Sequence, residues 1–177
     1  EAVTADSAHI VSIGYLALAR PQAAADTAVG WAPWRRHFPW EDRRDDNPLV
    51  AEVIVPRLRA WVAGTEDRAL AARRLERARL CFGFDDASWA PELALERYEL
   101  LYGARLVREA FRDRALPEPA DLPALGAPLP LDHRRILATA IGRLRGKLKY
   151  RPVLFELTPP VFTLLELQRA AEAVSGM

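Results

Sequence analysis

Five cations within nine residues are the feature of this sequence best suited to chemistry. The stretch RLRGKLKYR contains no acidic residue, and its cations are Arg143, Arg145, Lys147, Lys149 and Arg151. Guanidinium and ammonium groups at this density bind anions, and contacts with phosphates would give affinity for nucleic acid without sequence selectivity. The alternative is that these charges only form the solvated face of a helix.

The cluster belongs to a longer basic window. No acidic residue lies between Asp132 and Glu156, and Arg134 and Arg135 bring the window to about +7, whereas the whole chain has a net charge of +1. The rest of the chain therefore carries about −6. A nearly neutral protein that concentrates positive charge on one segment usually has an anionic partner for that segment. Nucleic acid is the leading candidate.

Other chemistry has weaker support. The histidines His9, His37 and His133 have neither the mutual spacing nor the nearby carboxylates of a metal site. An acidic group could bind a divalent cation through oxygen ligands, but two arginines lie within it, which favours an exposed, self-neutralising loop. Its members are Glu41, Asp42, Asp45 and Asp46. We predict no metal site and no catalytic residue, since no nucleophile elbow, phosphate-binding loop or dinucleotide turn occurs.

The lone cysteine and the tryptophans favour structural roles. Cys81 excludes an internal disulfide, which fits a reducing cytoplasm, and its apolar neighbours favour a core thiol. Trp31, Trp34 and Trp40 could form a ligand-stacking surface, but aromatic cover for a small core is the favoured interpretation. No apolar run approaches the roughly 18–20 residues that cross a bilayer.

The sequence around the basic cluster predicts the elements that position it, and together they indicate an α+β fold that is mostly helical. Strands are expected at 9–19, near 31–35 and at 153–157. Helices are expected at 48–63 with a kink at Pro56, from a Thr65 cap to a Gly83 stop, and from 92 to 113, where Leu93, Leu100, Ala104, Val107 and Phe111 fall on one stripe.

Beyond residue 113, prolines precede two more helices. Five prolines between 114 and 130 predict a stiff connector. Asp132 then opens a helix that Gly146 loosens or ends, and whose apolar face is Ile136, Leu137, Ala140, Ile141, Leu144 and Leu148. Thr163 and Glu166 form a capping box for a last helix that Gly176 ends. The domain division is 1–47, 48–116, the connector 117–130, and 131–177.

The C-terminal residues resemble a known family. Asp132-His133, the segment Arg143 to Tyr150, and Phe162 to Gln168 match the motifs of Nudix-related transcriptional regulators of NAD metabolism. The segment FPWEDRRDDNPLVAEVIVPRLRAWV and the stretch RLERARLCFGFDDASWAPELALERYELLYGARLVREAF resemble the alphaproteobacterial branch, often called the NAD regulator. HIVSIGYLALARP is similar to a late strand of the Nudix-like domain.

The resemblance implies a fold and a function. Residues 1–47 would end a Nudix-like effector domain, and 131–177 would begin a winged helix-turn-helix, with the chain truncated at both ends. The box that binds magnesium is absent, because Gly103 and Glu109 provide its only glycine–glutamate spacing and Pro117 stands where its arginine should follow. We therefore expect a non-catalytic cytoplasmic repressor that forms a homodimer, needs no cofactor, avoids membranes and responds to ADP-ribose or another NAD-related nucleotide.

Double-stranded DNA is the expected partner. The residues expected to bind it are Arg143, Arg145, Lys147, Lys149, Arg151, Thr163, Gln168 and Arg169. Two alternatives remain. A fragment of a Nudix-type nucleotide pyrophosphatase would be indicated by an intact box upstream. A helical interaction module would use the basic face to bind an acidic protein, and neutralising the cluster would abolish its heparin or DNA retention without any preference for duplex.

Overall fold

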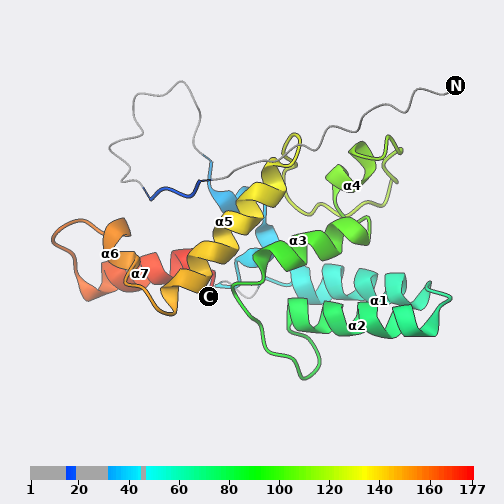
Figure 1. Ribbon diagram of the computed structural model, residues 1–177, viewed down its shortest axis with the longest axis horizontal. Helices are drawn as coiled ribbons and strands as arrows, with labels where there is room; N and C mark the ends of the chain where they lie inside the picture. The colour runs from blue at the N-terminus through cyan, green and yellow to red at the C-terminus, as the bar shows by residue number, and fades with distance from the viewer. Residues whose placement is uncertain (1–14, 19–31, 45–46) are drawn as a thin grey trace, which may run out of the picture.

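The computed structural model describes residues 15–18, 32–44 and 47–177, and every regular element there is helical. In chain order these elements are η2 (Trp34–Arg36), η3 (Pro39–Glu41), η4 (Leu49–Ile54), α1 (Val55–Ala63), α2 (Arg68–Phe82), α3 (Ala94–Gly103), α4 (Arg108–Arg112), α5 (His133–Leu148), α6 (Leu154–Leu157) and α7 (Leu164–Ser175) (Figure 1). The described part contains no strand, so the predicted α+β class is wrong for it.

None of the three expected strands is seen in the described residues. Residues 15–18 belong to no strand, and the rest of 9–19 lies outside the described residues. Near 31–35 the chain forms the 3₁₀ helix η2, and at 153–157 it forms α6. The α6 turn starts from Pro152, whose carbonyl accepts from the Phe155 N–H at 3.2 Å. Short apolar runs fit a strand or a helix equally well by periodicity, and the described residues include no strand that could accept their backbone hydrogen bonds.

Helices α1 and α2 form an antiparallel pair, side by side in Figure 1. Just before this helical segment, the side-chain oxygen of Asn47 accepts from the Leu49 N–H at 3.0 Å. The expected distortion at Pro56, which has no N–H, takes the form of a π-helical segment, η4, that leads into α1. The predicted Thr65 cap is wrong, because Asp67 accepts from the first amides of α2. Thr65 instead bonds back to the Trp61 carbonyl.

The helix predicted at 92–113 is interrupted. It divides into α3 and α4 around Arg105, which has a left-handed φ of 56°. The Leu106 N–H bonds to the Leu101 carbonyl at 2.9 Å and closes the end of α3. The apolar stripe still turns inward, since Leu100, Ala104, Val107 and Phe111 are all buried.

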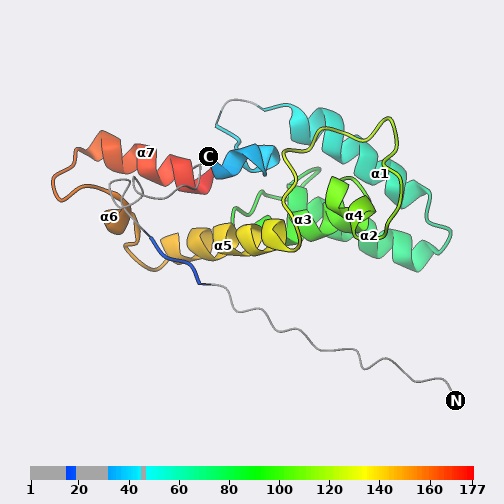
Figure 2. The ribbon, with the colours of Figure 1, turned by 90° about the horizontal axis from the view of Figure 1, so that it is seen from above.

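Helix α5 crosses α3, as Figures 1 and 2 both show. Small residues allow a close approach, because a Cβ at Gly142 would lie 2.7 Å from the Glu92 carbonyl oxygen. The buried face of α5 consists of Arg134, Ala138, Ile141 and Arg145. The predicted apolar face is therefore only partly right: Ile141 is buried, whereas Ile136 is 44% exposed on another side. The helix also continues through Gly146 to Leu148.

The proline-rich segment 117–130 packs on the body of the molecule. Leu125 is buried, and the Ala127 N–H bonds to the Arg36 carbonyl at 2.9 Å. The Leu129 N–H bonds to the Glu109 carboxylate at 3.0 Å. These contacts anchor the second part of the segment, 125–129, whereas residues 117–121 are exposed. The domain division at this point stays a prediction.

Helices α6 and α7 lie at the end of the molecule away from the α1–α2 hairpin (Figure 1). The Gly176 carbonyl accepts from the Arg43 N–H at 2.7 Å and anchors the end of α7. Within the described ranges, no helix has both the length and the apolar character to span a membrane.

Candidate nucleic-acid interface

A buried carboxylate removes one cation from the basic cluster. Glu41 is fully buried, and its two oxygens accept from Arg97 Nε at 2.5 Å and Nη2 at 2.8 Å. Arg145 also bonds to this carboxylate, and its Nε donates to the Val174 carbonyl at 2.8 Å. Because Arg145 is only 2% exposed, it is not part of the surface where we expected it to bind DNA.

A second buried ion pair holds the start of α5. Arg134 Nη1 lies 3.0 Å from Glu109 Oε2, and both side chains are almost completely buried. Burial lowers the pKa of the Arg134 guanidinium, and the Glu109 carboxylate opposes this effect. The pKa of Arg145 is lowered for the same reason and opposed by Glu41. Both arginines therefore join α5 to the core.

Two further cations of the window form ion pairs at the surface. Arg135 contacts the carboxylates of Glu99 and Asp132. Lys149 bonds to Glu92 and thereby lowers the pKa of that carboxyl group. Glu99 lies on α3 and Glu92 lies just before it, both far from the basic window in the sequence. The charge of the window is therefore reduced by residues that the local sequence pattern could not identify.

Three cations remain, namely Arg143, Lys147 and Arg151, which we call the α5 stripe. All three side chains are exposed, and none forms an ion pair with a described residue. They are four residues apart, so they share one face of the helix at intervals of about 6 Å. The Arg151 N–H bonds to the Lys147 carbonyl at 2.8 Å, which continues the helical turn beyond α5.

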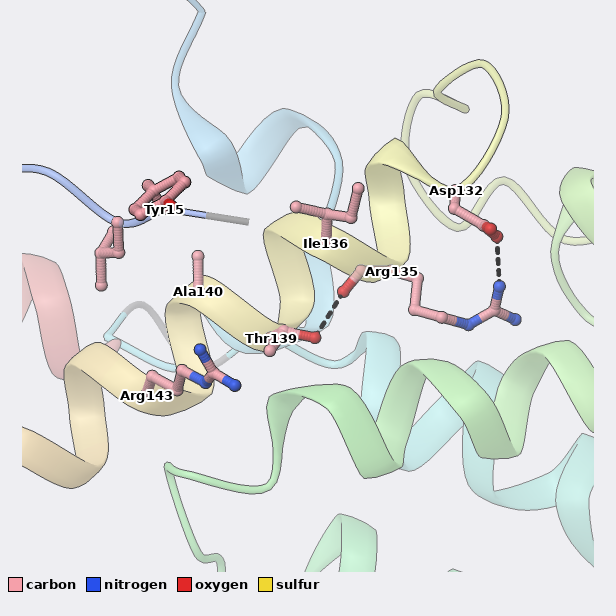
Figure 3. A pocket seen from close by; sticks show the side chains of 8 residues that line it. Tyr15, Asp132, Arg135, Ile136, Thr139, Ala140 and Arg143 are labelled. Atoms are coloured by element: carbon pink, nitrogen blue, oxygen red, sulfur yellow. Dashed lines mark hydrogen bonds and ion pairs between the residues drawn. The ribbon is translucent and has the colours of Figure 1, made fainter. Parts of the chain in front are cut away.

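Two hollows flank the α5 stripe. The first, of about 290 Å³, lies between residues 15–16 and the exposed side of α5, with Arg143 at one end and Asp132 at the other (Figure 3). Within it, the Thr139 hydroxyl donates to the Arg135 carbonyl at 2.9 Å. The second, of about 260 Å³, includes Lys147, Arg151 and one acidic group, Glu156. Leu16 contributes to both, so residues 15–18 cross α5 beside the stripe.

The residues expected to bind DNA on α7 are all exposed, but two already have partners. The Thr163 hydroxyl accepts from the Glu166 N–H at 3.2 Å, and the Glu166 carboxylate accepts from the Thr163 N–H at 2.7 Å. This confirms the capping box. Gln168 donates to Glu172 at 2.7 Å, whereas Arg169 forms no ion pair with a described residue. Their role in DNA binding stays a prediction.

The acidic group near residue 41 is only partly the exposed loop that we expected. Asp42 does pair with Arg44 at 2.7 Å and with Arg35 at 3.1 Å. Glu41, in contrast, is a buried partner of two arginines, which its position in the sequence did not indicate. Asp45 and Asp46 lie outside the described residues. Trp40 is fully buried, which confirms its core role, and its indole donates to Glu41 at 3.0 Å.

Part of this sequence is similar to that of a known transcriptional repressor. No family model matches the chain. A stretch of 53 residues, 30% of the chain, is 42% identical to the ADPR-responsive transcriptional repressor NtrR of Acinetobacter baylyi. The stretch covers 21% of that protein, so the match extends over about a fifth of the length of this relative.

Proposed function

We propose that this chain belongs to a DNA-binding transcriptional repressor, and that the α5 stripe contacts the phosphates of duplex DNA. The observation that carries this proposal is the distribution of charge in the basic window. Two cations are buried with carboxylates, two are paired at the surface, and the remaining Arg143, Lys147 and Arg151 lie exposed on one face. Phosphates would satisfy these three groups and release the counterions condensed on the DNA.

The relative supports the finer parts of the proposal. Because NtrR is an ADPR-responsive repressor, we propose that the present protein responds to ADP-ribose or another NAD-related nucleotide and regulates genes of NAD metabolism without catalysing a reaction. We further propose that it acts in the cytoplasm as a homodimer, because paired operator half-sites require paired DNA-binding surfaces. Arg169 on α7 is an additional contact in this proposal.

Salt-dependent DNA binding tests the α5 stripe. Affinity of the purified chain for a duplex, measured by fluorescence anisotropy at several salt concentrations, gives a slope of log affinity against log salt. Lys147→Ala and Arg151→Ala should each reduce the magnitude of that slope by roughly 0.9 for every stripe in contact with the duplex, hence by about 1.8 for a dimer, equally for operator and random sequences. Lys149→Ala should have a smaller effect, because Glu92 already neutralises this ammonium group.

A matched control is available on α1. Arg59 is exposed and pairs with Asp85 at 2.7 Å, remote from α5 in the sequence, so Arg59→Ala should leave the slope unchanged. An unchanged slope for the Lys147→Ala, Arg151→Ala double variant would contradict phosphate binding by the stripe. Another result would instead support the interaction module. In that case the chain needs the stripe for retention on heparin and binds an acidic protein, but it does not bind duplex DNA.

A further inference from the structure

A groove on the α1–α2 side of the molecule has an apolar floor and a charged rim. It has a volume of about 630 Å³ and lies between α2 and the start of α3. Ala72, Leu80, Cys81 and Leu93 supply the apolar surface. Leu80 is 48% exposed, although it lies one residue before the buried Cys81. A single exposed leucine is common on protein surfaces, so the partner of this groove must be identified from the charges of its rim.

The rim of the groove carries both signs of charge. Arg73 and Arg77 provide two cations, and Glu76 and Glu96 provide two carboxylates. Glu76 is held by Arg79, with N–O distances of 2.9 Å. Arg73 and Glu96 form no ion pair with any residue that the structure describes, although both line the same groove. The net charge of the rim is zero, which argues against nucleic acid as the occupant.

Such a rim is complementary to itself. A two-fold axis brings the same patch of two molecules together, so Arg73 of one copy can face Glu96 of the other, and the same pair repeats across the axis. Ala69 and Ala72 on the exposed side of α2 leave space for a second helix to approach closely. Leu80 of each copy can then be covered in the apolar part of the groove.

We propose that this groove is the interface between two copies of the chain, with Arg73 of each copy paired to Glu96 of the partner. This interface rests on the homodimer of the proposed function and assigns it a contact surface. Contact between the two α2 helices near Leu80 supplies the apolar centre, and the reciprocal ion pairs set the orientation. The α5 stripe takes no part in the interface.

Charge reversal tests the pairing without DNA. The dissociation constant of the dimer is measured by sedimentation equilibrium or light scattering of the full chain. Arg73→Glu and Glu96→Arg should each raise it by about tenfold or more, because each reversal places like charges together twice across the axis. The double variant should restore it towards the parent value. Arg68→Glu, on the same helix but outside the groove, is the matched control and should leave it unchanged.

Three outcomes would overturn the proposal. The parent chain could remain monomeric up to about 1 mM, a limit that corresponds to only about −4 kcal/mol of association. The single reversals could leave the dimer intact, or the double variant could fail to recover while its circular dichroism spectrum and unfolding midpoint match the parent. Because these measurements contain no DNA, failure here is distinguishable from a failure of phosphate binding by the α5 stripe.

Discussion

At Glu41, one buried carboxylate accepts hydrogen bonds from two guanidinium groups that come from different helices, α3 and α5. Replacing it by glutamine leaves Arg97 and Arg145 buried without a counter-charge. We expect Glu41→Gln to lower the free energy of unfolding by about 3–5 kcal/mol, the usual cost of removing one partner of a buried ion pair.

Urea denaturation of the parent and the variant measures this cost, and Asp42→Asn is its control. Asp42 is the next residue and also pairs with arginines, but near the surface, so its replacement should cost under about 1 kcal/mol. Similar midpoints for Glu41→Gln and the parent would show that the buried centre contributes little to stability.

The capping box on α7 makes a second prediction at the scale of the residue. Thr163→Ala should destabilise the protein by about 1 kcal/mol near neutral pH, since the Glu166 N–H in the first turn of α7 loses its acceptor. The hydrogen bond from the Thr163 N–H lowers the pKa of Glu166. A lowered pKa stabilises the fold above the unfolded value, about 4.3, and this contribution disappears as the pH falls through the folded value.

The pH dependence provides the check on that argument. Denaturation midpoints of the parent and Glu166→Gln should differ at pH 7 and converge at low pH, where Glu166 is protonated. A difference that stays constant from pH 7 to about 3 would exclude a carboxylate contribution to the cap.

The sequence predicted contacts between residues a few positions apart and missed contacts between distant residues. The capping box follows from residues only three positions apart, and it was confirmed. The role of Arg145 depends on Glu41, which lies 104 positions away, so the local pattern could not separate it from exposed Lys147. Helical periodicity is the signal that could have indicated the burial of Arg145, because it shares one face of the helix with Arg134, Ala138 and Ile141.

At the scale of the element, α5 contains two glycines with opposite surroundings. A Cβ at Gly142 would meet the Glu92 carbonyl oxygen at 2.7 Å, whereas nothing lies within 4 Å of a Cβ at Gly146. Alanine is favoured over glycine by about 1 kcal/mol inside a helix. Gly146→Ala should therefore stabilise the protein by up to that amount, and Gly142→Ala should destabilise it because α5 must move away from the approach to α3.

Thermal unfolding of the two variants tests the crossing of α5 and α3. The two substitutions are chemically identical and lie one helical turn apart, so each is the control for the other. Stabilisation by both would mean that the close approach at Gly142 is easily relieved.

Element prediction succeeded where caps or long periodic runs were present. The two helices that begin near Asp132 and Thr163 follow from such signals, and both exist. Prediction failed at 153–157, where five apolar-rich residues fit either a strand or a helix and only the surrounding structure decides. It also failed at Arg105, where a left-handed residue interrupts a stripe that remains buried.

At the scale of the whole molecule, the position of charge matters more than its sum. The basic window holds seven cations, yet only the three of the α5 stripe are exposed without an ion pair among the described residues. The groove beside α2 lies on a separate part of the molecule and has no net charge. The two proposed surfaces can therefore act at the same time, one on phosphates and the other on a second copy.

This combination predicts how DNA binding depends on assembly. Three phosphate contacts from one α5 stripe give a slope of log affinity against log salt of about −2.7, and two stripes give about −5.4. The parent should show the larger magnitude, and Arg73→Glu, if it is monomeric, should show about half of it. Arg68→Glu changes the net charge equally but should keep the dimer and the parent slope. Equal slopes for the monomeric and dimeric forms would mean that only one stripe of the pair contacts the duplex.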